Sequence, residues 1–299
     1  MKNIISRLIM KKNDHKPHNF TQILSEPKKM VIFFSNNPVD SFEIISYIPN
    51  WKKLFREYFL VFPEYEFSFF KRFQILENIN FLRYDDLPPF NDCVILNLCE
   101  DKNHVKHLKQ SRRSTIIGLN GTSNLKFIPT PSEPVQIIRS FAEFFNFPLK
   151  KTKLELELTP SESSITKQRF IQNRFNNFVL DLNGSTSTKM IEKLVIGIKR
   201  NFSANIYLTG KSINKKDYLN IVDVKVENLF DLFALAKKSN LFFSDNYRIA
   251  RLFSLLNVDI IFLGEKNRID NTDSIYPDNI YEWKDLVTKV ITKDNNPVS

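Results

Sequence analysis

NFVLDLNGSTSTKM (177–190) opens a series of short apolar runs that continues with ANIYLTGKS (204–212), NLFFSDN (240–246) and VDIIFLG (258–264). Each run is apolar on both of its faces, as a strand covered by helices on both sides must be. Turns of small or charged residues, and segments with helical periodicity, separate one run from the next. The stretch therefore predicts consecutive strands of a parallel sheet in an α/β domain.

Two turns that follow these strands have the composition of an anion-binding site. Ligands of parallel sheets bind at the carboxyl ends of the strands, where such turns lie. The first turn supplies the hydroxyl of Ser185 and the ammonium of Lys189 ahead of a helix, and the second supplies Lys211. Only six glycines occur in the chain, and two of them fall in these turns, although ordinary turn formation is the simpler explanation for each.

The first half of the chain shows a similar alternation of strands and helices. Strands are predicted at 30–35, 58–63, 80–84, 92–98 and 114–119, and helices from 41 onward, at 66–73, at 104–110 and at 133–147. The segment 149–159 alternates charged and aliphatic residues like an exposed strand or connector, so we place the domain boundary there. The predicted organisation is a basic leader (1–29), an N-terminal domain (30–150), a linker (151–170) and a C-terminal domain (171–299) with a helix near 283–291.

Composition indicates a globular protein that favours anionic partners. Hydrophobic residues make up 42% of the 299 residues, enough for a core in each of two domains. Lys and Arg outnumber Asp and Glu by 43 to 33, and the net charge of +10 favours nucleic acid, phosphorylated small molecules or acidic membrane surfaces. The basic residues are scattered, which favours a solvated lysine-rich surface over a nucleic-acid-binding stripe.

Cysteine usage and the N-terminus bear on the cellular location. Cys93 and Cys99 are the only cysteines, so we expect core thiols in a reducing cytosol rather than a disulfide framework. Residues 1–10 are too few and too charged for a membrane-spanning helix or a signal segment. Their apolar side chains share one helical face, as in an interfacial or partner-docking helix. The alternatives are a frayed leader and a helix packed on its own domain.

Other patterns point away from several classes of site. The sequence contains no Walker A motif, no GxGxxG, no GxSxG and no CxxC. His104 and His107 lie three residues apart, but no ligand spacing around them completes a zinc site, so a solvated helix is predicted. The run 51–73 interleaves aromatic and basic residues, and its periodicity favours core packing over stacking on nucleic acid.

The order of these motifs resembles the heptosyltransferase-type glycosyltransferases, which build the lipopolysaccharide core. The resemblance rests on FNDCVILNL (90–98), STIIGLNG (114–121) and the runs of the second half, and it covers residues 30–265. It implies a GT-B-like α/β fold of two Rossmann-like domains facing a cleft. The nucleotide-sugar donor is then expected on the C-terminal domain and the acceptor on the N-terminal domain.

The resemblance also implies a general base after the first strand, which is Asp40 in SNNPVDSF (35–42). An inverting sugar transfer needs a group that takes the proton of the acceptor hydroxyl, and cations or backbone donors for the departing diphosphate. Asp40 also lies near a predicted helix start, where a capping role is equally consistent.

The donor-side signature of this family is an Asp-Ser/Thr-Gly-Pro-x-His turn, and its counterpart here begins at Asp245. The Asp is retained, but Tyr247, Arg248 and Ala250 replace the Gly, Pro and His, and Val39 replaces the glycine that precedes the base. Tyr247 narrows the approach of the backbone to a diphosphate, whereas Arg248 adds a cation able to bind it bidentately. A capping or turn role is the alternative for Asp245.

We therefore expect a divergent inverting glycosyltransferase that moves a hexosyl or heptosyl group from a nucleotide-activated donor to a cell-envelope glycan or lipopolysaccharide core. The expected site consists of a catalytic Asp40 and the donor-binding residues Ser185, Lys189, Lys211, Asp245 and Arg248. No metal, other cofactor or nucleic acid is expected, and the partners are a nucleotide-sugar and a glycan or lipid-linked acceptor. The expected location is cytoplasmic, with the leader as a candidate for peripheral contact with the inner membrane. The alternative is a non-catalytic pseudo-glycosyltransferase that acts as a binding or assembly subunit.

Overall fold

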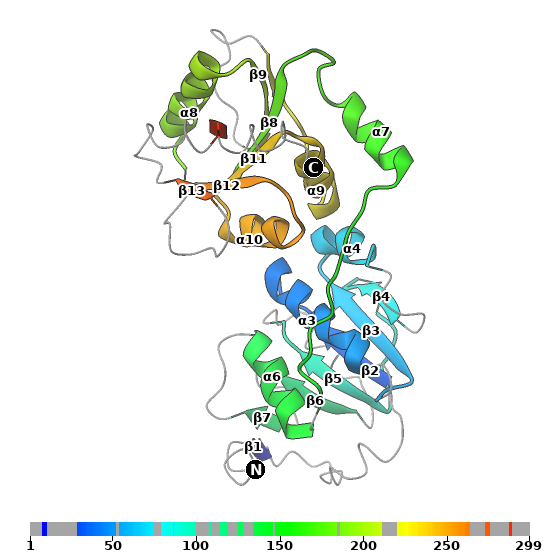
Figure 1. The fold of residues 1–299 in the computed structure, drawn as a ribbon. Helices are drawn as coiled ribbons and strands as arrows, with labels where there is room; N and C mark the ends of the chain where they lie inside the picture. The colour runs from blue at the N-terminus through cyan, green and yellow to red at the C-terminus, as the bar shows by residue number, and fades with distance from the viewer. Residues whose placement is uncertain are drawn as a thin grey trace, which may run out of the picture. The chain divides into compact units, whose positions relative to one another are not determined.

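The chain forms two compact units, residues 1–154 and 155–299, each built around its own sheet (Figure 1). The computed structural model describes residues 8–10, 29–51, 54–73, 79–85, 87–99, 108, 114–118, 125–127, 134–145, 147–183, 186–210, 220–263, 273–275 and 287–288.

The first unit contains a seven-stranded sheet with the order β1-β7-β6-β5-β2-β3-β4, in which only the β1–β7 pair is antiparallel. Its strands are β1 (Leu8–Met10), β2 (Lys29–Phe33), β3 (Glu57–Phe62), β4 (Ile79–Arg83), β5 (Cys93–Asn97), β6 (Thr115–Gly118) and β7 (Leu125–Phe127). Strands β2 to β7 have the doubly wound Rossmann order, and the winding reverses between β2 and β5.

The first helix among the described residues of this unit begins earlier than the sequence indicated. Helix α3 (Pro38–Trp51) starts at Pro38 rather than near Ser41 because proline suits the first helical position and Asn37 caps the helix. The Asn37 side-chain oxygen accepts a hydrogen bond of 3.3 Å from the backbone N–H of Val39. Two further helices are α4 (Glu64–Phe70) and α6 (Pro134–Phe145).

Aromatic side chains fill the core of the first unit. Trp51, Tyr58 and Phe69 are fully buried, and the rings of Phe62 and Phe70 stack with a centroid separation of 4.9 Å. Core packing of the aromatic run 51–73 is therefore confirmed. The two cysteines are also buried in an apolar cluster, as core thiols should be.

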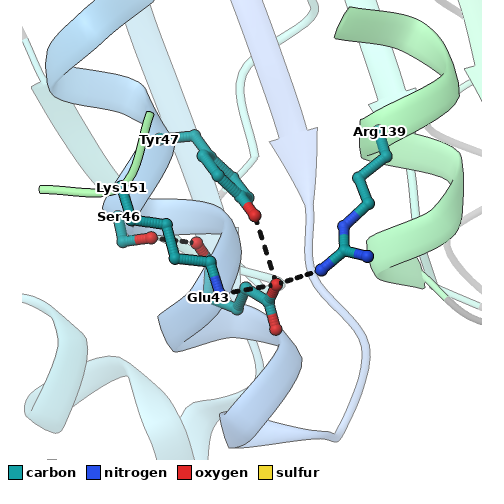
Figure 2. Close-up of polar contacts among 5 residues, drawn as sticks. All are labelled: Glu43, Ser46, Tyr47, Arg139 and Lys151. Atoms are coloured by element: carbon teal, nitrogen blue, oxygen red, sulfur yellow. Dashed lines mark hydrogen bonds and ion pairs between the residues drawn. The ribbon is translucent and has the colours of Figure 1, made fainter. Parts of the chain in front are cut away.

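One carboxylate joins α3 to α6 and to the segment that leaves the first unit (Figure 2). Oε1 of Glu43 accepts hydrogen bonds from Arg139 and Lys151, both at 2.9 Å, and from the Tyr47 hydroxyl at 3.2 Å. The Glu43 side chain is only 15% exposed, and its burial raises the pKa. The two cations outweigh burial and hold the pKa of Glu43 below its ordinary value of 4.5.

The same segment follows α3 through a set of hydrogen bonds. The backbone N–H of Thr152 donates to the Ser46 carbonyl at 2.8 Å, and the Asn50 amide donates to the Lys150 carbonyl at 2.7 Å. The indole N–H of Trp51 donates to the Pro148 carbonyl at 2.8 Å. Residues 148–152 are thus held along α3 and contain no strand.

The second unit contains a six-stranded, fully parallel sheet with the order β10-β9-β8-β11-β12-β13. Its strands are β8 (Asn176–Leu182), β9 (Ala204–Gly210), β10 (Ile221–Asp223), β11 (Leu241–Ser244), β12 (Ile260–Leu263) and β13 (Asp273–Ile275). This is again the Rossmann order, with its reversal between β8 and β11. The predicted α/β class with two Rossmann-like domains is therefore confirmed.

Alternate side chains of the second sheet pack against different helices. Leu180, Leu182 and Phe243 contact helix α8 (Thr188–Asn201) on one face. Phe242 contacts Phe253 of helix α10 (Tyr247–Leu255), which also touches helix α9 (Leu229–Lys238), on the other face. Both faces are covered, which explains why these strands read as continuous apolar runs.

Several predictions about the chain outside the strands are corrected or remain open. Leu8–Met10 form strand β1 on β7 rather than part of a helical face, because the edge of the sheet offers them backbone partners. The expected linker contains helix α7 (Pro160–Gln168). Thr159 and Glu162 form a reciprocal capping box at its N-terminus, a sequence signal that the prediction of a linker did not use. The predicted helix 104–110 lies outside the described residues except for Leu108, and the predicted helix near 283–291 lies outside them except for residues 287–288.

Within the described parts of the chain, no helix has the length and apolar character needed to cross a membrane.

We expect Glu43→Gln to lower the free energy of unfolding by about 1 kcal/mol at pH 7, because a partly buried carboxylate loses two charge-assisted bonds. A lowered pKa in the folded state stabilises the fold above the unfolded-state pKa and loses that effect as the pH falls through the folded-state pKa. The difference between wild type and variant should therefore shrink as the pH falls below the ordinary pKa of 4.5 and through the lower pKa of Glu43 in the folded protein. Urea-induced unfolding followed by tryptophan fluorescence tests this, and Glu57→Gln is the control because the Glu57–Lys29 pair is solvent-exposed. Equal losses in both variants would contradict the role given to Glu43.

Candidate functional site

A row of polar side chains crosses the carboxyl edge of the second sheet where its winding reverses. The strand register places Asp181 of β8 opposite Thr209 of β9 on one side and opposite Ser244 of β11 on the other. Oδ1 of Asp181 accepts hydrogen bonds from the Thr209 hydroxyl at 2.9 Å and from the Asn183 amide at 2.8 Å. Oδ2 accepts from the Ser244 hydroxyl at 3.2 Å. All four side chains therefore meet at the point where ligands of doubly wound sheets bind.

Asp181 is buried and only 3% exposed, so its charge is poorly solvated. Burial raises the pKa of Asp181, three hydrogen bonds act in the opposite direction, and the neighbouring carboxylate of Asp245 raises it further. The net pKa lies above the ordinary value of 3.8. Sequence reasoning missed Asp181, although a single Asp inside an apolar strand, with polar ends on the two neighbouring strands, was the signal.

Asp245 ties two turns of this edge together. It follows β11, is buried, and its Oδ2 accepts a hydrogen bond of 3.0 Å from the backbone N–H of Thr186 in the turn after β8. The helix cap is instead Asn246, whose side-chain oxygen accepts from the backbone N–H groups of Arg248 and Ile249 at 3.0 and 3.4 Å. The capping alternative for Asp245 is therefore wrong, and the turn alternative agrees with its contact.

The predicted cations lie in the first turns of two helices that begin at this edge. Lys189 is exposed in the first turn of α8, which follows β8, and Arg248 is exposed in the first turn of α10, which follows β11. Cations at these positions add to the positive end of each helix dipole. Ser185 and Lys211 lie outside the described residues.

Asp40 of the first unit lies in the first turn of α3, beyond the strand β2 at which the first sheet reverses its winding. It is half-buried, and its Oδ2 accepts a hydrogen bond of 2.7 Å from the Asn37 amide. Since Asn37 is the cap, the idea that Asp40 caps the helix is wrong. Asp40 is a first-turn carboxylate with its own polar partner.

A second acidic residue in this region was missed by the sequence analysis. Glu66 of α4 is only 3% exposed, and its Oε2 accepts a long hydrogen bond of 3.4 Å from the hydroxyl of Ser41. Ser41 follows Asp40 on α3 and also donates to the Asn37 carbonyl. Glu66 therefore links the beginnings of α3 and α4. A Glu in the first turn of an aromatic helix gives no sequence signal for burial.

Gly210 lies where β9 ends and cannot carry a side chain without displacing its neighbour. Its φ is +96°, and a Cβ atom there would lie 1.5 Å from Oδ1 of Asn183. This glycine allows β9 to end against the side chain that donates to Asp181. Among the residues that the structure describes, no group of three or more His, Cys, Asp or Glu side chains is arranged to hold a metal ion.

Solved structures similar to this chain include glycosyltransferases. No family model matches the sequence, and no curated protein matches it. The ADP-heptose lps heptosyltransferase II of E. coli aligns over 90% of this chain and 100% of its own, with a TM-score of 0.59 and 8% identity. The glycosyl transferase family 9 protein of Veillonella parvula DSM 2008 aligns over 90% and 97%, with a TM-score of 0.57 and 10% identity. The heptosyltransferase WaaC of E. coli with ADP-2-deoxy-2-fluoro heptose aligns over 90% and 100%, with a TM-score of 0.54 and 10% identity.

The chain has the heptosyltransferase fold. The resemblance inferred from the motifs is thus confirmed at the level of the fold, with the low identity of a divergent sequence. The structure shows what surrounds two residues that differ from the donor turn of the heptosyltransferases. Ala250, at the position of the family His, is fully buried in α10, and the Tyr247 ring packs against Phe262 with a centroid separation of 6.1 Å. Both positions are therefore part of the packing between α10 and the sheet.

We expect Gly210→Ala to lower the free energy of unfolding by about 1–2 kcal/mol, because the alanine must adopt a positive φ and displace Asn183. Thermal unfolding monitored by circular dichroism measures the change. Gly197→Ala is the control, since Gly197 lies within α8, where alanine is favoured by up to about 1 kcal/mol. A Gly210→Ala protein as stable as wild type would show that the edge of the sheet does not require glycine.

Proposed function

We propose that this protein is a divergent glycosyltransferase that moves a sugar from a nucleotide-activated donor to a cell-envelope glycan or lipopolysaccharide core. The observation that carries the proposal is the polar row at the reversal point of the second sheet. Two helices begin beside that row, and each has a cation, Lys189 or Arg248, in its first turn. Proteins with a similar fold support this choice. They are named heptosyltransferases, and two of their structures contain ADP or an ADP-sugar.

The proposed donor site holds the diphosphate mainly by side-chain charge. Asn246 already occupies the backbone N–H groups of Arg248 and Ile249, so the start of α10 offers its dipole and the guanidinium rather than those two N–H groups. A guanidinium binds two phosphate oxygens at once, which suits a leaving diphosphate. Lys189, Ser185 and Lys211 complete the proposed set, and the proposed mechanism uses these cations instead of a metal.

The proposed general base is Asp40. Inverting transfer requires one group to accept the proton of the acceptor hydroxyl while the sugar leaves its diphosphate. In this proposal Asp40 accepts that proton and the residues of the second unit stabilise the charge that develops on the diphosphate. The hydrogen bond from Asn37 fixes the orientation of the carboxylate before the acceptor arrives.

Arg248→Ala should weaken binding of ADP by about 1–3 kcal/mol, because a charge-assisted contact to the diphosphate is lost. Isothermal titration calorimetry with ADP, GDP, UDP and CDP identifies the preferred nucleotide and measures the loss. Arg251→Ala is the matched control, because Arg251 lies one turn later on α10 and bonds the Tyr247 hydroxyl at 3.1 Å. Unchanged affinity in Arg248→Ala would remove Arg248 from the donor site.

Asp40→Asn should reduce transfer by roughly 10²- to 10⁴-fold, because the amide keeps the shape and the contact to Asn37 but accepts no proton. The assay follows release of ADP from ADP-heptose, with lipopolysaccharide lacking its core heptoses as acceptor, and further nucleotide-sugars extend the panel. Circular dichroism should show the same fold and melting temperature for both proteins. Equal transfer rates in wild type and variant would exclude Asp40 as the base.

A non-catalytic pseudo-glycosyltransferase is the second candidate, and the environment of the donor turn favours it. The position of the family His is a buried Ala250, so the imidazole of the family signature has no equivalent at this position. In that case wild type should bind nucleoside diphosphates yet show neither sugar transfer nor hydrolysis of any nucleotide-sugar. Transfer by wild type that depends on Asp40 would exclude this candidate.

A further inference from the structure

The buried carboxylate of Asp181 holds the ends of three adjacent strands at once. It belongs to β8, its partner Thr209 belongs to β9, and its partner Ser244 ends β11. A third partner, Asn183, lies just beyond β8.

Asp181 does not face a ligand itself. Only 3% of the residue is exposed, and both carboxylate oxygens accept hydrogen bonds from the protein. The described groups that act on its charge are three hydrogen-bond donors and a second carboxylate, that of Asp245. Burial of a carboxylate carries a desolvation penalty, which an apolar residue in a parallel strand would avoid. The buried Asp181 is therefore explained by the three residues that its hydrogen bonds hold in position, which are Thr209, Asn183 and Ser244.

Each partner of Asp181 is followed directly by a turn of the proposed donor site. Thr209 precedes Gly210 and Lys211, and Ser244 precedes the turn that carries Asp245 and Arg248. Asn183 precedes the turn of Ser185 and Lys189, which Asp245 also holds through Thr186. A shift of any one strand end would therefore move a turn that carries a proposed ligand group.

We propose that Asp181 is the positioning residue of the donor site, which fixes the ends of β8, β9 and β11 from which the proposed donor-binding residues follow in sequence. The inference rests on the proposed function for the existence of that ligand. It adds Asp181 to the proposed donor site as a residue that touches neither donor nor acceptor. Asp181 acts through Thr209, Asn183 and Ser244. The ends of β8, β9 and β11 then act as one unit, because they share one hydrogen-bond acceptor.

A matched structural control exists at the opposite edge of the same sheet. Asn205 of β9 is fully buried, and its amide donates to Asn173 at 2.8 Å and to Asn177 at 2.9 Å. Like Asp181, it joins neighbouring segments through several buried hydrogen bonds. It lies at the amino ends of the strands, away from the proposed ligand turns, so its loss should affect stability alone.

The experiment measures stability and nucleotide affinity in the full-length chain for wild type, Asp181→Asn, Asp181→Ala and Asn205→Ala. ADP, GDP, UDP and CDP are titrated by calorimetry at a temperature where all proteins are folded by circular dichroism. We expect the dissociation constant of the preferred nucleotide to rise about tenfold or more in Asp181→Ala, because misplaced ligand groups lose contacts. Asp181→Asn, which keeps one acceptor oxygen for Thr209 and Asn183 and alters the bond to Ser244, should show a smaller rise of about threefold. Asn205→Ala should lower the melting temperature and change the dissociation constant less than about twofold.

The outcomes separate this inference from the proposed function. Wild type that binds none of the four nucleotides would overturn both. Wild type that binds, with Asp181→Ala or a folded Asp181→Asn binding equally well, would overturn the positioning role and leave the donor site in place. A loss of affinity in Asn205→Ala that matches the loss in the Asp181 variants would assign Asp181 a structural role only. If Asp181→Ala does not fold, the Asp181→Asn protein decides the question.

Discussion

A parallel sheet covered by helices on both faces can hold polar side chains only at the ends of its strands. Elsewhere a polar group would be buried against apolar helices, where each unsatisfied hydrogen bond is unfavourable by about 1–3 kcal/mol. Phe178, Leu180 and Phe243 obey this rule within the second sheet, and Asp181, Thr209 and Ser244 lie where the apolar pattern ends. The concentration of polar chemistry at the carboxyl edge is thus a result of how the sheet is covered.

The two units use this edge in different ways. In the first unit the edge carries a half-buried acid, Asp40, close to the start of a helix, and a buried acid, Glu66, bonded to the next residue of that helix. In the second unit the acids Asp181 and Asp245 face inward and organise turns, and the cations lie on the outside. This difference matches a proposed division between proton transfer in one unit and anion binding in the other.

The sequence was sufficient for the main strands, the α/β class and two separate sheets, because runs such as Leu241–Phe243 and Ile260–Leu263 have no other stable environment. It was not sufficient for edge strands such as β1 and β10, because each is only three residues long and too short to show a periodic pattern. Helix starts depended on individual caps, so Asn37 and Asn246 displaced Asp40 and Asp245 from the capping role. Asp181 required the register of three strands, which periodicity within one strand does not contain. The assignments of Asp40, Lys189, Asp245 and Arg248 to a site remain predictions, as do those of Ser185 and Lys211.

The hydrogen bonds between α3 and residues 148–152 limit where this protein tolerates change in length. Pro148, Lys150 and Thr152 are each bonded to α3, so a deletion or insertion among them would break hydrogen bonds to the helix that carries Asp40. Beyond Thr152 the chain has no regular structure until α7 begins at Pro160. Evolutionary or engineered variation in the length of the connection should therefore be confined to residues 153–158, because Thr159 caps α7. An independently expressed first unit has to extend past Thr152 to keep these hydrogen bonds to α3.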